Sequence, residues 1–141
     1  MERPRFHLAF PVECLDGARR FYVGVLGARE GRSASRWVDF DLWGHQLSAH
    51  LVDVGRGEAI HTNGVDGDAV PVRHFGCILS WGTWDLLAER LRAERVPFRI
   101  APRVRFAGEV GEQGTFFVDD PSGNCLEFKA FRHDDQVFRT S

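Results

Sequence analysis

One pattern of apolar and polar residues occurs twice along this chain, and this internal repetition constrains the fold more than any other feature. Residues 6–12, FHLAFPV, and residues 73–79, RHFGCIL, are short apolar runs with a histidine at the second position. A helical pattern of apolar residues follows each run. The apolar positions are Ala18, Phe21, Tyr22 and Val25 in the first half and Trp84, Leu87, Ala88 and Leu91 in the second. Both halves are therefore predicted to begin with a strand and then a helix.

The ends of the two predicted helices carry capping residues. Asp16 and Thr83 are the predicted N-caps, because their side-chain oxygens can accept a hydrogen bond from the first helical turn. Gly27 follows the first helix and is predicted to end it.

Strand-like stretches separated by glycine-containing turns follow each helix. Residues 36–51 and 114–129 align with each other when Gly44 is placed on Gly123. Each stretch completes a set of about three strands after its helix. Residues 53–72, which contain four Gly and one Pro, form the predicted connector between the halves.

These elements predict an α+β fold of two βαβββ modules, at about residues 5–65 and 72–131, within one domain of residues 1–141. The net charge of −2 argues against a nucleic-acid partner. No apolar run approaches the roughly 20 residues of a membrane span, and the N-terminus does not resemble a signal peptide. Three cysteines without a Cys-x-x-Cys pair favour a reduced, cytoplasmic location.

Alternation along the predicted strands separates an apolar face from a face that carries polar chemistry. His7 points away from the apolar residues beside it, and His74 does so in the matching strand. Glu127 is opposite the apolar residues of the last strand, and Ser48 and His50 take the same place in the first half. If the two sheets curve toward each other, these groups converge.

Two imidazoles and one carboxylate that point into one cavity form a metal-ligand set. A single histidine on a half-buried strand is more often a structural residue. The matched placement of His7 and His74 in two repeats, with Glu127 on the corresponding face, favours metal binding instead. The sequence therefore predicts a divalent-metal site at His7, His74 and Glu127.

Four features occur in order along the chain: His7 in the opening strand, LDGARRFYVGVLG at 15–27, His74 at the start of the second module and DDPSGNCLEF at 119–128. With these motifs the chain resembles the vicinal oxygen chelate superfamily, which groups glyoxalase I, bleomycin-resistance proteins and extradiol dioxygenases. The resemblance covers residues 5–131. It implies two modules whose curved sheets surround a cavity that holds a divalent metal, with ligands from the first and last strands of each module.

The resemblance places three ligands on His7, His74 and Glu127, and a fourth position falls on Ser48. Glyoxalase-like members have a carboxylate there, so Ser48 argues against a glyoxalase I assignment. The remaining His–His–Glu set matches the facial triad of non-haem iron enzymes, which leaves positions for a chelating substrate and O₂. His50 shares the face of Ser48 and is the candidate catalytic base, with a role as replacement ligand left open.

Three functions remain open at this point. The first is a divalent-metal-dependent enzyme resembling an extradiol-type dioxygenase, which acts on a small aromatic or vicinal-oxygen substrate. Its expected ion is Fe(II), with Mn(II), Zn(II) or Ni(II) as alternatives. The second is a metal-free ligand-binding protein of the bleomycin-resistance type, and the third is a glyoxalase-like lyase or isomerase. The resemblance also implies a homodimer.

Overall fold

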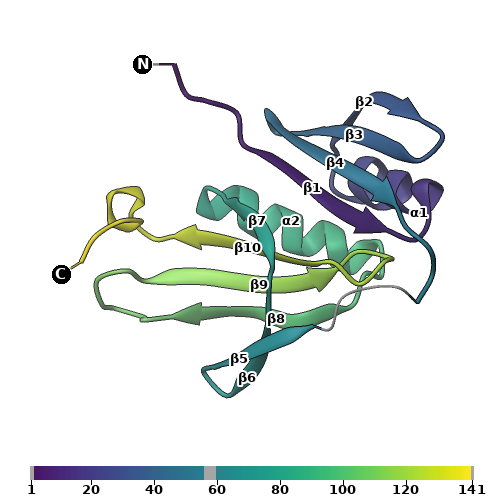
Figure 1. Cartoon of the computed structure of the whole chain (residues 1–141). Helices are drawn as coiled ribbons and strands as arrows, with labels where there is room; N and C mark the ends of the chain where they lie inside the picture. Colours follow the sequence, from purple (N-terminus) through teal and green to yellow (C-terminus); the bar gives the residue numbers. More distant parts are fainter. Residues whose placement is uncertain (1, 56–59, 141) are drawn as a thin grey trace. The chain divides into compact units, whose positions relative to one another are not determined.

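The computed structural model describes residues 2–55 and 60–140, and the chain divides into two compact units (Figure 1). The first unit is Met1–Ala59 with Asp120–Asn124, and the second unit is Ile60–Asp119 with Cys125–Ser141. Each unit contains a four-stranded sheet and a helix. That the two units form a single domain stays a prediction.

Both units contain the predicted βαβββ order of elements. In the first unit these are β1 (His7–Val12), α1 (Leu15–Arg19) continued by the π-helix η1 (Arg20–Val25), β2 (Arg29–Ala34), β3 (Trp37–Leu42) and β4 (His45–Leu51). In the second unit they are β7 (Phe75–Ile78), α2 (Trp81–Ala93), β8 (Phe98–Arg105), β9 (Gln113–Asp119) and β10 (Cys125–Phe131). The second unit also contains β5 (His61–Val65), β6 (Asp68–Val72) and a 3-10 turn, η2 (Asp134–Gln136).

The two four-stranded sheets share one topology, with strand orders β1-β4-β3-β2 and β7-β10-β9-β8. In each sheet the first strand pairs in parallel with the last, and the other pairs are antiparallel. Aromatic contacts join each helix to one face of its sheet: Tyr22 to Phe10, and Trp84 to Phe116. The opposite face of each sheet is called its open face below. The repeat and the α+β class predicted from the sequence are confirmed.

The first helix departs from the predicted periodicity because its second half is π-helical. Leu26 donates its N–H to the carbonyl of Phe21 at 2.9 Å, a step of five residues that adds one residue to the turn. Leu26 is buried as a result, whereas the predicted core residue Val25 is half-buried. Gly27 follows with a φ of 80°, and it ends the helix as predicted.

Both helices begin before their predicted caps. Cys14 caps α1 by accepting the Gly17 N–H at 3.3 Å, and Ser80 caps α2 by accepting the Thr83 N–H at 3.4 Å. The predictions of Asp16 and Thr83 as N-caps are therefore wrong, because both residues lie inside the first turn. The first N–H groups of a helix have no partner inside the helix. In each helix a side-chain sulfur or hydroxyl, three residues before the donor, accepts one of them.

The predicted connector contains a β-hairpin, formed by β5 and β6, that the sequence analysis does not predict. Its turn residues Asp66 and Gly67 have φ values of 49° and 86°. Two consecutive positive φ values fit a type I′ turn, for which Asp-Gly is a preferred pair. Val70 of β6 packs into a buried apolar cluster of the second unit. Residues 56–59 of the connector lie outside the described residues.

The turn Asp120–Asn124 belongs to the first unit, and it contains a buried aspartate that bonds the first helical segment. Asp120 is 4% exposed and accepts hydrogen bonds from the Tyr22 hydroxyl at 2.9 Å and from the N–H groups of Ser122 and Asn124. Burial raises the pKa of Asp120, and the donors around it offset this only in part. Tyr22 is fully buried on the first helix, which agrees with the structural role that its place on the apolar stripe predicts.

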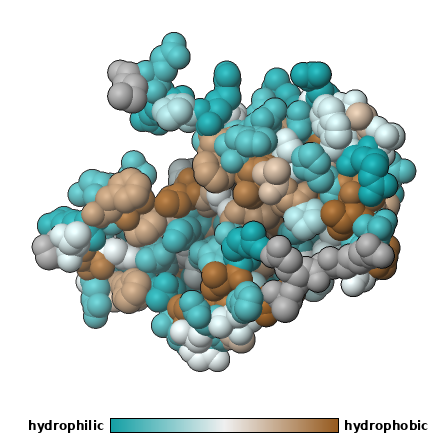
Figure 2. Space-filling view, viewed as in Figure 1, coloured by the Kyte–Doolittle hydropathy of each residue, from teal (hydrophilic) through white to brown (hydrophobic). Residues whose placement is uncertain are grey.

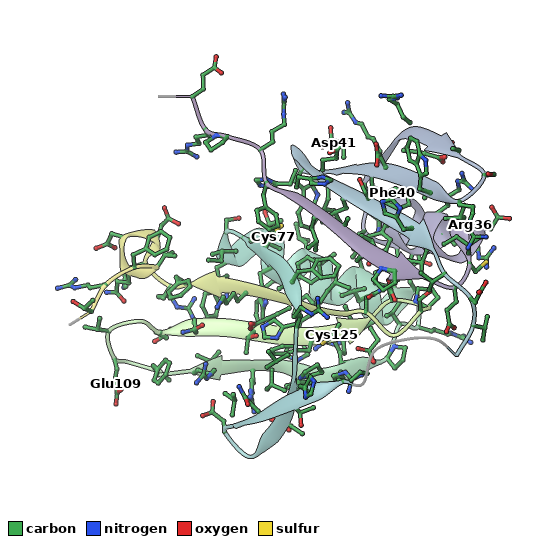
Figure 3. The ribbon with its side chains drawn as sticks, in the orientation of Figure 1. Arg36, Phe40, Asp41, Cys77, Glu109 and Cys125 are labelled. Carbon is green, nitrogen blue, oxygen red and sulfur yellow. The ribbon has the colours of Figure 1, made fainter. Side chains whose placement is uncertain are left out.

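The surface of the chain mixes hydrophilic and hydrophobic residues on the face seen in Figure 2. In the part of the chain that the structure describes, no helix is both long and apolar enough to cross a membrane. The three cysteines are free thiols, among them Cys77 and Cys125, which Figure 3 labels. Burial raises the pKa of Cys125 to about 12, so this thiol is unreactive at neutral pH.

Candidate metal centre

The strand registers place the candidate residues of the two halves at equivalent positions. In the first sheet Ala9 is the partner of Ser48, and in the second sheet Gly76 is the partner of Glu127. Each predicted histidine precedes the first member of its pair by two residues. Ser48 is therefore the counterpart of Glu127, as the alignment of the glycine turns predicts.

His74 lies directly before β7 and is oriented by two contacts within the second unit. Its Nδ1 lies 2.7 Å from the carbonyl oxygen of Pro71, which can only accept, so Nδ1 carries a proton. Its Nε2 lies 3.4 Å from Oε1 of Glu127. The hydrogen bond to Glu127 raises the pKa of His74 more than burial lowers it. When the Nδ1–H of a histidine is held by a backbone carbonyl, its Nε2 is the nitrogen available to a metal.

Glu127 is half-buried on the open face of the second sheet, where three polar groups surround its carboxylate. Besides His74, the Thr115 hydroxyl donates to Oε2 at 3.0 Å, and the Lys129 ammonium lies 3.9 Å from Oε1. Burial raises the pKa of Glu127, but the combined effect of His74, Lys129 and Thr115 is larger and lowers it. The carboxylate is therefore ionised at neutral pH, as a metal ligand must be.

Gly76 allows the backbone of β7 to approach Glu127 closely. A Cβ atom at this position would collide with the backbone carbonyl of Glu127. The glycine is required here for space and not for a turn, because its pair with Glu127 lies inside the parallel ladder. The close approach fixes the part of β10 that carries the carboxylate next to the strand that follows His74.

His74, Glu127 and Lys129 line one cavity of about 260 Å³ in the second unit. Two nitrogen or oxygen ligands of a tetrahedral ion, with bonds of about 2.1 Å, stand roughly 3.4 Å apart. The separation of 3.4 Å between Nε2 of His74 and Oε1 of Glu127 fits that spacing. Among the described residues of the second unit, no third His, Cys, Asp or Glu completes a metal-binding group with them. The pair fits two ligands of a divalent ion and leaves the remaining positions to other donors.

The third predicted ligand, His7, lies on β1 in the first unit and is exposed. Strand alternation places it on the face away from Leu8 and Phe10, as predicted. Its participation in a site with His74 and Glu127 stays a prediction.

The fourth ligand position of the family pattern has a local partner in this chain. Ser48 is 5% exposed and donates its hydroxyl to Oδ1 of Asp39 at 2.5 Å. Gln46 donates to Oδ2 of the same carboxylate at 3.3 Å. The neighbouring strand β3 thus brings a carboxylate next to the position where glyoxalase-like members are expected to have one.

His50, the predicted catalytic base, is exposed on β4 between the partners Pro11 and Trp37. It lies on the face away from the buried residues Leu47 and Ala49, so the predicted strand register is correct. Its distance from a metal stays a prediction.

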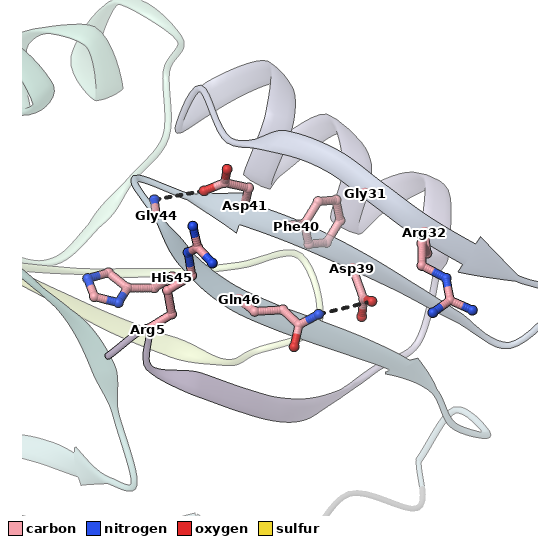
Figure 4. A pocket seen from close by; sticks show the side chains of 9 residues that line it. All are labelled: Arg5, Gly31, Arg32, Asp39, Phe40, Asp41, Gly44, His45 and Gln46. Carbon is pink, nitrogen blue, oxygen red and sulfur yellow. Dashed lines mark hydrogen bonds between the residues drawn. The ribbon is translucent and has the colours of Figure 1, made fainter. Parts of the chain in front are cut away.

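A second cavity, of about 300 Å³, lies in the first unit (Figure 4). Its wall includes Arg5, Arg32, Asp39, His45 and Gln46. Figure 4 shows Arg32 at one end and His45 at the other, with the Gln46–Asp39 hydrogen bond between them. The wall of this pocket includes side chains of both charge signs.

Four residues around the candidate ligands are not identified from the sequence: Pro71, Thr115, Lys129 and Asp39. Pro71 contacts His74 through its backbone carbonyl, so the residue type at this position does not indicate the contact. Thr115 becomes a neighbour of Glu127 only through the β9–β10 register. Lys129 does have a signal, because it is the one Lys among eighteen basic residues and shares the strand face of Glu127.

Comparisons with known proteins identify the family. The model of the glyoxalase/bleomycin resistance protein/dioxygenase superfamily matches residues 6–128. A protein described by the same three names, from Alicyclobacillus acidocaldarius, has a solved structure that is 34% identical, with a TM-score of 0.79 and 96% of each chain covered. No curated protein matches the chain.

Two more distant structures share the fold. The fosfomycin resistance protein FosX from Listeria monocytogenes is 19% identical, with a TM-score of 0.69 over 97% of this chain and 100% of that chain. A lactoylglutathione lyase from Agrobacterium tumefaciens is also 19% identical, with a TM-score of 0.64 over 92% and 94%. With the repeated βαβββ fold and the family match over residues 6–128, the chain belongs to the glyoxalase/bleomycin resistance protein/dioxygenase superfamily.

Proposed function

We propose that the protein is a divalent-metal-dependent enzyme whose ion is held by His7, His74 and Glu127 and whose substrate is a small molecule with adjacent oxygen atoms. Fe(II) is the proposed ion, and an extradiol-type dioxygenation is the proposed reaction. The observation that carries this proposal is the orientation of His74: Nδ1 bonds the Pro71 carbonyl, and Nε2 lies 3.4 Å from Glu127. This is the arrangement that fixes a histidine tautomer for metal binding.

A bound divalent ion would lower the pKa of a substrate hydroxyl and hold the reactants together. The residues of the chain supply the rest. The ionised Glu127 provides negative charge, and Thr115 holds one of its two oxygens in place. His50 is the proposed proton acceptor, because a ring nitrogen of a neutral imidazole can accept a proton. Ser48 and Asp39 bond each other, so the proposed site has three protein ligands rather than four.

A metal-free ligand-binding function is the second candidate, and one observation favours it. Glu127 already has His74 and Lys129 beside it, so its negative charge is balanced without a metal. In this case the cavity of about 260 Å³ would bind a small ligand directly. The two candidates differ in whether the protein binds a metal with a stoichiometry near one.

Metal titration distinguishes the candidates. Calorimetry with Mn(II), Zn(II) and, without oxygen, Fe(II) is expected to give one site per chain in the parent protein. His7→Ala should lower the affinity by at least the roughly 10–100-fold that loss of an outer-shell partner costs, because it removes a direct ligand. His133→Ala is the control, since this histidine lies in the exposed C-terminal segment and should leave the affinity unchanged. A parent protein that binds none of the three ions contradicts the proposed function and leaves the metal-free candidate.

Two further expectations complete the proposal. A homodimer is expected, and sedimentation that gives only monomer at high protein concentration would contradict it. A cytoplasmic location is expected as well, and cell fractionation checks it.

A further inference from the structure

The β5–β6 hairpin has no counterpart in the βαβββ repeat, yet its last strand leads directly to His74. The chain passes from Pro71 to His74 in three residues, and the Pro71 carbonyl accepts the Nδ1 proton of His74 at 2.7 Å. Pro71 is fully buried, and its partner across the hairpin is Thr62. The carbonyl that orients His74 is therefore part of the hairpin.

Two kinds of contact hold the hairpin to the second unit. One is the apolar cluster of Val70 with Ile100, Phe117 and Cys125, which are all less than 10% exposed. Phe117 lies on the open face of the sheet, because its ladder partner is Glu127. Its ring also meets the His74 ring edge-to-face, with centroids 5.2 Å apart. The hairpin therefore packs on the same surface that carries the candidate ligands.

The other contact is a set of three ion pairs between two arginines of β8 and the aspartates at the turn and start of β6, among them Arg103–Asp66 at 3.9 Å. Arg103 of β8 donates to Asp68 at 2.6 Å, and Arg105 donates to Asp66. Arg103 is the ladder partner of Thr115, whose hydroxyl bonds Glu127. Arg103, which holds the hairpin, and Thr115, which bonds Glu127, are therefore paired residues of neighbouring strands. Figure 1 labels β5, β6 and β8.

We propose that the β5–β6 hairpin, anchored by the Arg103–Asp68 ion pair, is the positioning element that sets the orientation and tautomer of His74. Arg103 and Asp68 are positioning residues, since they act through Pro71 and do not contact the imidazole. The proposal rests on the proposed function only where it takes His74 as a metal ligand. The tautomer of His74 can be measured without any metal.

The chain offers a matched control on the same strand. Arg99 of β8 forms a comparable ion pair with Asp119, with nitrogen–oxygen distances of 2.6 and 2.8 Å. The side chains of Arg99 and Arg103 are 33% and 28% exposed. The Arg99 pair joins β8 to β9 and contains no hairpin residue, so Arg99→Met removes a similar interaction while the ion pairs of the hairpin remain.

The test compares Arg103→Met, Asp68→Asn and their double variant with the parent and with Arg99→Met. Long-range ¹H–¹⁵N correlation spectra of the metal-free proteins, recorded with a neutral imidazole, report which ring nitrogen of His74 carries the proton. The parent and Arg99→Met are expected to show the Nδ1–H form, and the hairpin variants a mixture of both forms. The double variant should resemble the singles, because the two residues act as one unit.

Zn(II) calorimetry gives the second measurement. Where the parent binds Zn(II), the hairpin variants should bind roughly tenfold more weakly, and Arg99→Met should match the parent. An unchanged His74 tautomer in both hairpin variants overturns the inference, and so does an unchanged Zn(II) affinity. If the parent binds no metal, the proposed function fails while the tautomer measurement alone decides the inference.

Discussion

The open faces of the two sheets have the same backbone register but different chemistry. On the first sheet, Ser48 bonds Asp39, and both groups belong to adjacent strands of one ladder. On the second sheet, Glu127 at the equivalent position meets His74, and a hairpin outside the repeat holds that histidine. The comparison shows that the duplicated fold determines the position of a side chain on its sheet. In the second unit the β5–β6 hairpin, which lies outside the repeat, orients the histidine that contacts this side chain.

The two equivalent turns make a similar contrast. Asp41 is exposed and accepts the Gly44 N–H at 2.7 Å, which closes its own turn. Asp120 is buried and bonds Tyr22 on another element as well as its own turn. Asp41 therefore stabilises only its own turn, while Asp120 stabilises its own turn and also joins it to the buried Tyr22.

The largest effect is expected at the buried turn. Asp120→Ala leaves the Tyr22 hydroxyl and two turn N–H groups without their acceptor, and each such buried group costs about 1–3 kcal/mol. The free energy of unfolding should fall by about 3 kcal/mol in chemical denaturation. Asp41→Ala is the matched control and should change it by less than about 0.5 kcal/mol, because the turn is exposed. Equal losses in the two variants would contradict the contrast between the turns.

The loss of unfolding free energy in Asp120→Ala, relative to the parent, should depend on pH. Because burial raises the pKa of Asp120, the folded protein keeps this proton at pH values where the unfolded chain has lost it. The stabilisation from Asp120 is therefore greatest below the ordinary aspartate pKa and declines as pH rises through the raised value. The difference in unfolding free energy between the parent and Asp120→Ala should shrink from pH 4 toward pH 7. A difference that grows over this range would show the pKa shift to have the opposite sign.

The next effect sharpens the contrast between Ser48 and Glu127. Glu127→Gln keeps the size of the side chain but removes its charge, so divalent-metal affinity should fall by about 100-fold. Calorimetry with Mn(II) or Zn(II) measures this. Glu112→Gln is the control, because Glu112 pairs with Arg132 in the loop region and should leave the affinity unchanged. Equal affinity in the parent and Glu127→Gln would remove Glu127 from the site.

A smaller effect on stability tests the close contact between β7 and β10 at Gly76. Gly76→Ala introduces a Cβ against the Glu127 backbone, and the forced shift of β7 should lower the free energy of unfolding by about 1–3 kcal/mol. The first sheet already has Ala9 at the equivalent position. Ala9→Gly should therefore cost only about 0.5–1 kcal/mol, from backbone entropy. If Gly76→Ala unfolds with the same free energy as the parent, the β7–β10 pair accepts an alanine as readily as the β1–β4 pair does.

The smallest effect concerns the charge next to Glu127. Lys129→Met removes a cation from the cavity that would hold the metal, so divalent ions should bind about threefold more tightly. Lys129→Arg keeps the charge and should match the parent in the same calorimetry. Weaker metal binding in Lys129→Met would indicate that this lysine supports the site instead of opposing it.

The sequence predicts the framework of the fold because its signals are local. The apolar spacing of Trp84, Leu87 and Leu91 fits the regular α-helix that buries them. The same spacing fails at Val25, since a π-helical turn depends on packing that no short window of sequence contains. The pair Asp66-Gly67 is typical of a hairpin turn, but Asp68 follows it directly, and the glycine-rich composition of residues 53–72 favours a loop.

The candidate site is only partly predictable for a different reason. Strand alternation assigns His7, His74 and Glu127 to faces, because side chains alternate with period two. The orientation of His74 depends on a backbone carbonyl, and a backbone group has no residue type to recognise. Thr115 also escapes detection, since the β9–β10 register brings it to Glu127 across twelve residues.

The hydrogen bond between Tyr22 and Asp120 spans 98 residues of the chain. During synthesis the first five elements leave the ribosome long before the turn Asp120–Asn124 exists, since translation adds about 5–20 residues per second. For several seconds the phenol of Tyr22 must remain without its acceptor. The N-terminal half therefore reaches its final packing only when nearly the whole polypeptide has been made, and a chain truncated before residue 120 should leave that half poorly ordered.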